Sequence, residues 1–182
     1  MRTLNTTALH VGAPRTGLIV LIAALLALAA LAWGGAAVAA PDSTIAALDI
    51  RADLEQQTFD DINEARQQRG VAALNADSEL GNLARERSQD MALNHYFSHY
   101  AADGSLIFVR LLDADNVPFL KAGENLAWNT YSDDVSAQVA VDGWKASPAH
   151  ARNLYDSAYS RAGLGAVNAD GKKYYTIIFV GD

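Results

Sequence analysis

The stretch Ala162–Val180 reads AGLGAVNADGKKYYTIIFV, and it decides how the C-terminal part of the chain folds. Two β-prone runs flank the turn-forming residues 168–171, which end in Asp-Gly. An Asp-Gly pair between two such runs is a strong short-range signal for a hairpin. The sequence therefore predicts an antiparallel pair of strands at the end of the chain.

Upstream of this hairpin the apolar residues recur at helical spacing. Caps and stops bound four predicted helices, which run from Leu54 to Gly70, from Asp77 to about His95, from Ser105 to Leu112, and from Ser132 or Asp133 to Pro148. Helices first and a hairpin last are typical of an α+β domain whose helices and sheet form separate layers.

Residues 1–39 have the three parts of a secretory signal peptide. Arg15 supplies the basic start, residues 17–33 form an uncharged apolar run, and small residues lead up to Ala39. We expect cleavage after Ala39, because Pro41 hinders cutting at the next bond. An uncleaved membrane anchor is the alternative, since the apolar stretch is just long enough to span a bilayer. In both cases the rest of the chain is expected outside the cytoplasm or in the cell envelope.

The exported part is expected to be one domain, residues 54–182, preceded by a short segment over 40–53. The chain has 14 Lys and Arg against 21 Asp and Glu, a net charge of −7, and two of the arginines lie in the leader. Such an acidic domain lacks the basic face that nucleic-acid binding needs, so we expect no nucleic-acid partner. The sequence has no Cys, which excludes disulfides, thiolate metal sites and a cysteine nucleophile.

Only three histidines follow the leader: His95, His99 and His150. The first two are four residues apart, which puts two imidazoles on one face of a helix and is by itself weak evidence for a metal pair. The alternative is a helix C-terminus that carries His because positive charge suits that end. Glu124 is the one carboxylate in an extended run with apolar neighbours, and His150 comes just past a helix end.

Five groups of residues occur in a fixed order along the chain: Ile62-Asn63-x-x-Arg66, Phe97-Ser98-His99, Gly123-Glu124-Asn125-Leu126-Ala127, Trp144-x-x-Ser147-Pro148-x-His150, and Gly163-Leu164-Gly165 with Tyr174-Tyr175-Thr176. This pattern resembles the CAP (SCP-like extracellular) superfamily, which groups cysteine-rich secretory proteins, antigen 5 and pathogenesis-related proteins, and within it the cysteine-free bacterial branch. The resemblance covers residues 54–180. It implies an α-β-α sandwich with a small antiparallel sheet between helical layers.

The resemblance also implies a cavity lined by two histidines and two carboxylates, which in several relatives binds a divalent metal. His99, Glu124 and His150 match three positions of that cavity, whereas Ser147 and Tyr174 replace a carboxylate and a histidine. The remaining three residues are the ligand set of an open site for a divalent metal such as zinc. A hydrogen-bonded polar cluster that orders the loops is the alternative. The rim of the cavity is assigned to His95, Ser147 and Tyr174.

The leading functional hypothesis is a secreted or surface CAP module without catalytic residues. Its cavity would bind a divalent metal, a small molecule, a lipid, a peptide or a cell-envelope component, with membrane contact only through an uncleaved leader. The alternative is a metal- or histidine-assisted extracellular hydrolase of peptides or cell-wall material. Ser147 at the second carboxylate position weakens that alternative, because it removes the most obvious general base. A third hypothesis is a surface protein in which the cluster only stabilises the fold.

Overall fold

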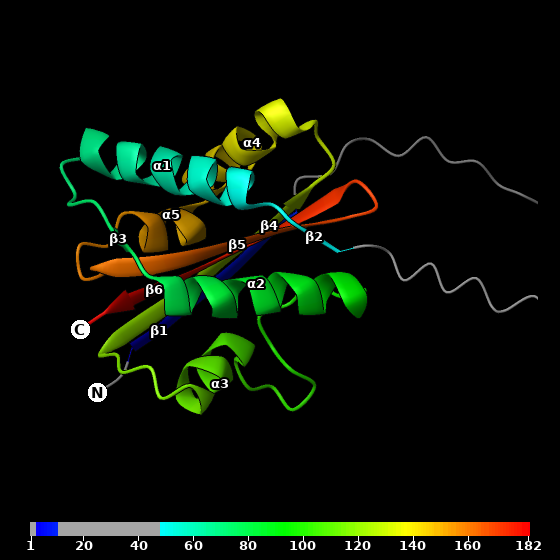
Figure 1. The fold of residues 1–182 in the computed structure, drawn as a ribbon. Coiled ribbons are helices and arrows are strands. Elements are labelled where there is room, and N and C mark those ends of the chain that lie inside the picture. The colour runs from blue at the N-terminus through cyan, green and yellow to red at the C-terminus, as the bar shows by residue number, and fades with distance from the viewer. Residues whose placement is uncertain (1–2, 11–47) are drawn as a thin grey trace, which may run out of the picture.

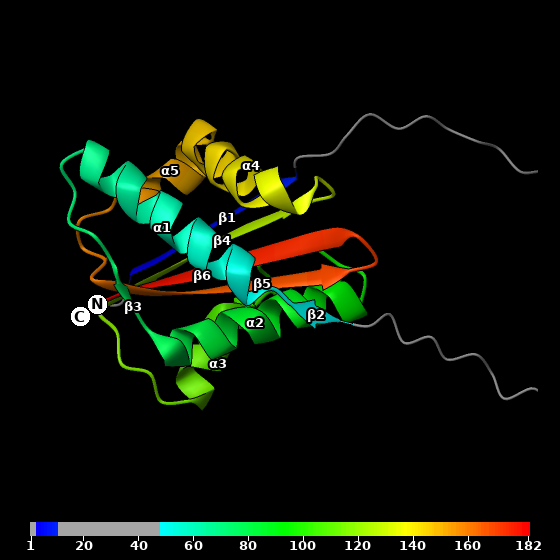
Figure 2. The same cartoon turned by 45° about the horizontal axis from the view of Figure 1, so that its top comes forward.

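Helices cover both faces of one central sheet in the computed structural model, which describes residues 3–10 and 48–182 (Figure 1). One face carries α1 Ala52–Gln68, α4 Asp133–Ala146 and α5 Pro148–Leu154, and the other carries α2 Ser78–Leu93 and α3 Ile107–Ala114 (Figure 2). The predicted α-β-α sandwich is therefore confirmed. The apolar run and the cleavage site predicted for the leader lie outside the described residues, and none of the helices described is long and apolar enough to cross a membrane.

The described residues contribute six strands to the sheet: β1 Thr3–His10, β2 Asp49–Ile50, β3 Asn75–Ala76, β4 Lys121–Asn129, β5 Arg161–Ala169 and β6 Lys172–Gly181. Their order is β1-β4-β6-β5-β2, and β3 also pairs with β5. The long pairs β4–β6 and β5–β6 are antiparallel, whereas β1–β4 and β3–β5 are parallel. The sheet is thus mixed rather than purely antiparallel, because strands distant in sequence add to it without hairpin connections.

The C-terminal hairpin forms as predicted. Ala169 pairs with Lys172, and the two residues between them, Asp170 and Gly171, have φ angles of 50° and 80°. Positive φ at both central residues is the requirement of the turn type that best suits a two-residue hairpin. Side chains of β6 then alternate between the faces, with Ile177 in the core under α1 and α4 and Ile178 in the core under α2 and α3.

The predicted helices are present, with differences at their ends. Asp77 caps α2 by accepting hydrogen bonds from the backbone N–H groups of Glu79 and Leu80, at 2.9 and 3.1 Å. The short helix predicted over 105–112 lies at 107–114. Pro148 was expected only to end a helix, yet it also begins α5. Proline suits the first turn because the N–H that it lacks has no partner there anyway.

A buried arginine ties α1 to the loops at one end of the sheet. Arg66 is fully buried, and its guanidinium donates hydrogen bonds to four backbone carbonyls, those of Ala72, Leu154, Asp156 and Tyr159. Burial lowers the pKa of this side chain. Through these contacts Arg66 links α1 to the loops.

Helix α2 lies almost in contact with the backbone of β5. A Cβ atom added to Gly163 would lie 2.1 Å from the backbone N of Gly81, and one added to Gly165 would lie 2.2 Å from the backbone N of Arg85. No side chain fits at either position of β5. By contrast, a Cβ at Gly81 would meet only the carbonyl oxygen of Leu164, at an ordinary 3.9 Å.

Replacing Gly163 with Ala is therefore expected to lower the free energy of unfolding by about 2–3 kcal/mol, because the added methyl group forces α2 away from the sheet. The matched change Gly81→Ala lies at the same contact but has room, and it removes a glycine from a helix interior. It is expected to be neutral or to stabilise by roughly 0.5–1 kcal/mol. Urea denaturation of both variants measures the difference. Equal effects of the two changes would contradict the close approach.

Candidate functional site

Glu124 lies near the middle of β4, is completely buried, and has a partner for each carboxylate oxygen. The Nε of Arg87 donates to its Oε1 at 3.1 Å, and the Nδ1 of His99 lies 2.5 Å from its Oε2. Arg87 and His99 are 1 % and 5 % exposed, so water is almost excluded from the whole group. We call Arg87, His99 and Glu124 the buried cluster.

Arg87 links the buried cluster to the loop that follows α2. Its Nη1 donates to the hydroxyl of Tyr96 and its Nη2 to the carbonyl of Ser98, both at 2.7 Å. The Tyr96 hydroxyl in turn donates to Asp90. Burial and this hydrogen bond raise the pKa of Tyr96 to about 12, although Arg87 acts in the opposite direction. The arginine thus holds a helix, a loop and a strand together.

His99 belongs to that loop and not to the helix. Helix α2 ends at Leu93, and His95 is exposed with a left-handed φ of 52°. The same-face arrangement of His95 and His99 inferred from their spacing is therefore wrong. The carbonyl of His99 accepts a hydrogen bond from Ile107 N, which connects the loop to α3. Its ring Nε2 is buried, and none of the residues that the structure describes gives it a hydrogen-bond partner.

The helix that carries His150 lies on the opposite face of the sheet. Neighbouring residues of a strand point to opposite faces. Glu124 points to the α2 face, and Asn125 points to α5, where its Nδ2 donates to the backbone carbonyl of His150 at 3.2 Å. Within residues 3–10 and 48–182, no three His, Cys, Asp or Glu side chains are arranged to hold a metal ion. The structure thus brings together His99 and Glu124 but not the metal-ligand set of His99, Glu124 and His150.

The residues assigned to the rim are dispersed as well. Ser147 lies between α4 and α5 on the face of His150. Tyr174 is buried on the α2 face, where it packs in one cluster with Met91 and Leu126. His95 is exposed beyond the end of α2. These three side chains do not surround one cavity.

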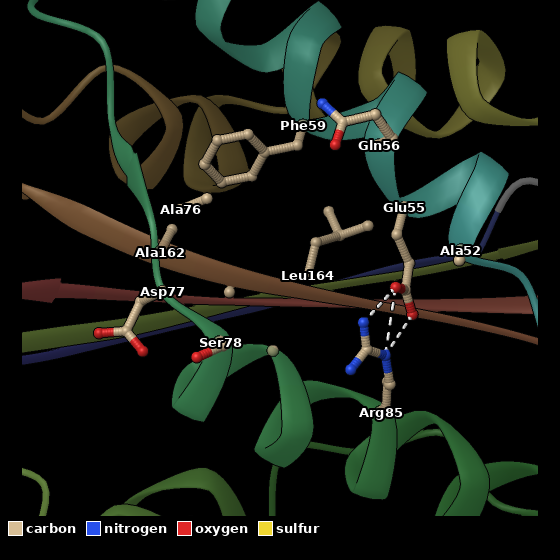
Figure 3. Close-up of a pocket in the computed structure, with 12 residues that line it drawn as sticks. Ala52, Glu55, Gln56, Phe59, Ala76, Asp77, Ser78, Arg85, Ala162 and Leu164 are labelled. Atoms are coloured by element: carbon tan, nitrogen blue, oxygen red, sulfur yellow. Dashed lines mark hydrogen bonds and ion pairs between the residues drawn. The ribbon is translucent and has the colours of Figure 1, made fainter.

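A cleft of about 410 Å³ opens elsewhere, between α1 and α2 beside β5 (Figure 3). The residues that define its chemistry are Glu55, Gln56, Phe59, Asp77, Arg85 and Leu164. It lies where the outer edge of β5 is partly uncovered: β3 pairs with positions 161–162 and β2 with positions 167–168, and between them the described residues supply no strand. Sequence reasoning missed this cleft because its lining comes from four separate elements, and the one motif segment among them, Gly163-Leu164, does not by itself indicate a site.

An ion pair closes one end of the cleft and joins the two helices that flank it. Arg85 donates to both oxygens of Glu55, with Nε–Oε1 and Nη2–Oε2 distances of 2.9 and 2.7 Å (Figure 3). Glu55 also accepts a hydrogen bond from the backbone N of Ala166 in β5. The hydrogen bonds to Glu55 raise the pKa of Arg85. Asp77 and Ser78 line the opposite end (Figure 3), so Phe59 and Leu164 form an apolar middle between two polar ends.

The CAP family model, described as the cysteine-rich secretory protein family, matches residues 59–182. This chain belongs to the CAP family. It is 35 % identical over 131 residues to the uncharacterized membrane protein YlbC of Bacillus subtilis (strain 168), a match that covers 72 % of this chain and 35 % of that protein.

Two solved structures resemble this CAP domain. An extracellular protein containing a SCP domain from Bacillus anthracis str. Ames shares 29 % identity at a TM-score of 0.60, over 71 % of this chain and 41 % of its own. An outer surface protein from Borrelia burgdorferi has a TM-score of 0.65 over 74 % of this chain and 96 % of its own; at 19 % identity it shares the fold. The chain spans about a third of the YlbC protein and two fifths of the Bacillus anthracis protein.

Replacing Glu124 with Gln is expected to destabilise the domain by about 3–5 kcal/mol, because Arg87 is left as a buried charge without its anion. The matched control is Asp142→Asn, which breaks the exposed pair of Asp142 and Lys145 on α4, at 3.0 Å. That change is expected to cost less than about 1 kcal/mol. Urea or thermal unfolding measures both, and a Glu124→Gln variant as stable as the control would show that the cluster does not support the fold.

Proposed function

We propose that this chain is an exported CAP module that binds a ligand in the cleft between α1 and α2 and does not catalyse a reaction. The observation that carries the proposal is that the carboxylate of the family motif and the open cleft lie in different parts of the domain. The carboxylate of the family motif, Glu124, is buried and bonded through both oxygens, whereas the open space is lined by other residues. In this proposal the buried cluster stabilises the fold, and the cleft binds the ligand.

The proposed location is the extracellular space or the cell envelope. The N-terminal pattern of a basic residue, an apolar run and small residues before Ala39 supports export. The similar proteins from Bacillus anthracis and Borrelia burgdorferi are described as extracellular and as an outer surface protein. Both observations favour a location outside the cytoplasm.

The ligand proposed for the cleft is an amphipathic small molecule, with an apolar middle and polar groups toward its ends. A volume of about 410 Å³ lies within the range of small-molecule sites. Phe59 and Leu164 supply apolar walls, while Gln56 and the Glu55–Arg85 pair supply hydrogen-bonding groups at one end. A lipid or a short peptide with one apolar side chain has this chemistry.

The hydrolase alternative has less support. A general base has to lie within hydrogen-bond reach of the proton that it removes. Glu124 already accepts from Arg87 and pairs with His99, and the metal-ligand geometry that would activate water is not formed by the described residues. Saturable hydrolysis of a peptide or cell-wall substrate by the pure protein, abolished by Glu124→Gln at an unchanged melting temperature, would contradict the binding proposal.

The cleft is tested with the fluorescent probe anilinonaphthalene sulfonate, which has an apolar body and an anionic end. Ala76 is exposed in β3 and lines the cleft, so Ala76→Trp is expected to fill the space and weaken probe binding at least tenfold. Ala73→Trp is the control, since Ala73 is exposed nearby but lies outside the cleft. Equal binding to the wild type and to both variants would place the probe elsewhere and contradict the proposed site.

A further inference from the structure

The edge of β5 that borders the cleft carries backbone groups directed away from β6. In a strand, the backbone N–H and C=O groups of alternate residues point to the same edge. The carbonyl of Ala162 accepts a hydrogen bond from the backbone N of Asp77, at 3.0 Å. The carbonyl of Ala166 accepts one from the backbone N of Arg51, at 2.9 Å. Leu164 lies midway between the two alanines, so its own N–H and C=O point to this same outer edge.

The register of the C-terminal hairpin leads to the same orientation. Ala169 and Lys172 enclose the two-residue turn and are paired with each other, so their backbone groups face one another. In steps of two along β5, Gly165 and Gly163 direct their backbone groups to β6 as well. The backbone groups of Leu164, which lies between these glycines, therefore point away from β6.

Among the described residues, no strand lies beside the backbone groups of Leu164. β3 ends at Ala76, opposite Ala162, and β2 ends at Ile50, opposite Val167. Leu164 lines the cleft and is only 5 % exposed, so water has little access to it. A buried backbone donor or acceptor that lacks a partner costs free energy. A ligand that supplies a partner for both groups is therefore favoured.

We propose that the cleft binds one residue of an extended peptide, or a similar secondary amide, which pairs with Leu164 in antiparallel direction. This inference rests on the function proposed above and selects the peptide over the lipid. In an antiparallel ladder, two opposite residues exchange both N–H···O=C bonds. One ligand residue thus gives the N–H of Leu164 an acceptor and its C=O a donor. A hydrocarbon chain supplies neither group, and an ester supplies no N–H.

The side chain of that ligand residue lies beside Phe59. Directly opposite residues of an antiparallel pair have their side chains on the same face of the sheet. The side chain of Leu164 points toward α1, and it belongs to the core under α1 and α4 (Figure 3). Phe59 of α1 packs against the same core and lines the cleft. An apolar side chain on the ligand residue is therefore the one that fits.

The direction of the ligand follows from the antiparallel pairing. β5 begins beside Asp77, and farther along it the backbone N of Ala166 donates to Glu55. A ligand antiparallel to β5 therefore begins near the Glu55–Arg85 pair and ends near Asp77. Its first carbonyl then lies toward a cationic group and its last N–H toward a carboxylate, which are the partners that each requires.

The probe for the experiment is N-acetyl-L-phenylalanine methylamide, added to the purified full chain. Its matched control is the ester in which an oxygen atom replaces the N–H of the phenylalanine residue. The ester keeps the shape and the acceptors of the amide, but it offers no donor to the carbonyl of Leu164. The amide is expected to bind saturably and at least about fivefold more tightly than the ester, because the ester leaves that carbonyl without a partner.

Nuclear magnetic resonance of the ¹⁵N-labelled chain measures both affinities and locates the contact. The amide proton of Leu164 is expected to move downfield as the probe saturates the protein, since a hydrogen bond to it forms. The amide protons of Gly163 and Gly165, which point to β6, are expected to move less. Binding is expected to be lost in Ala76→Trp, which fills the cleft, and kept in the control Ala73→Trp.

Three results would overturn this inference: equal affinity for the amide and the ester, no saturable binding of the amide, or a Leu164 signal that stays unchanged at saturation. If anilinonaphthalene sulfonate still binds in the cleft, each of them removes the peptide as the ligand but leaves the cleft as the binding site. If that probe also fails to bind there, the proposed function is wrong as well. The two failures are thus distinguished by separate measurements.

Discussion

The buried contact between Arg87 and Glu124 joins the centre of the sheet to the α2 layer, and much of the domain is positioned by it. Removing both charges from water is costly, and the cost is offset only if the remaining donors and acceptors are satisfied. Here the second oxygen of Glu124 pairs with His99, and the other nitrogens of Arg87 bond Tyr96 and Ser98. The contact therefore fixes the loop after α2, and with it the start of α3.

The second constraint is the close approach of α2 to β5 at Gly163 and Gly165. It holds α2 against one face of β5 while α1 lies on the other, and the Glu55–Arg85 pair passes from one helix to the other beside that strand. Short strands β2 and β3 cover only the two ends of the outer edge. The cleft is the space that this arrangement leaves in the middle.

Local sequence signals predicted most of the fold. The hairpin followed from Asp170-Gly171, the start of α2 from Asp77, and the sandwich from the motifs of the family. β1 could not be predicted in this way, because a parallel pair between residues far apart in sequence leaves no local pattern. Helix α5 was missed because the same proline both ends one helix and begins the next.

The site was less predictable than the fold. Motif order indicated that Glu124 and His99 meet, and they do. It could not indicate that Asn125, the neighbour of Glu124, turns to the other face and contacts the helix of His150. Because neighbouring residues of β4 point to opposite faces of the sheet, the carboxylate of Glu124 contacts His99, on the other face from the helix that carries His150. The cleft could not be predicted, since its walls come from α1, α2, β3 and β5 and only Gly163-Leu164 among them belongs to a motif.

A double-mutant cycle on Arg87→Met and Glu124→Leu tests most directly whether the buried cluster is structural. Each single change leaves one buried charge without its partner, whereas the double change removes both charges. We expect the free energies of unfolding to be strongly non-additive, with the double variant at least about 2 kcal/mol more stable than the sum of the single effects implies. It should also keep the probe-binding cleft. Additive effects, or a double variant that folds normally and loses the cleft, would contradict this account.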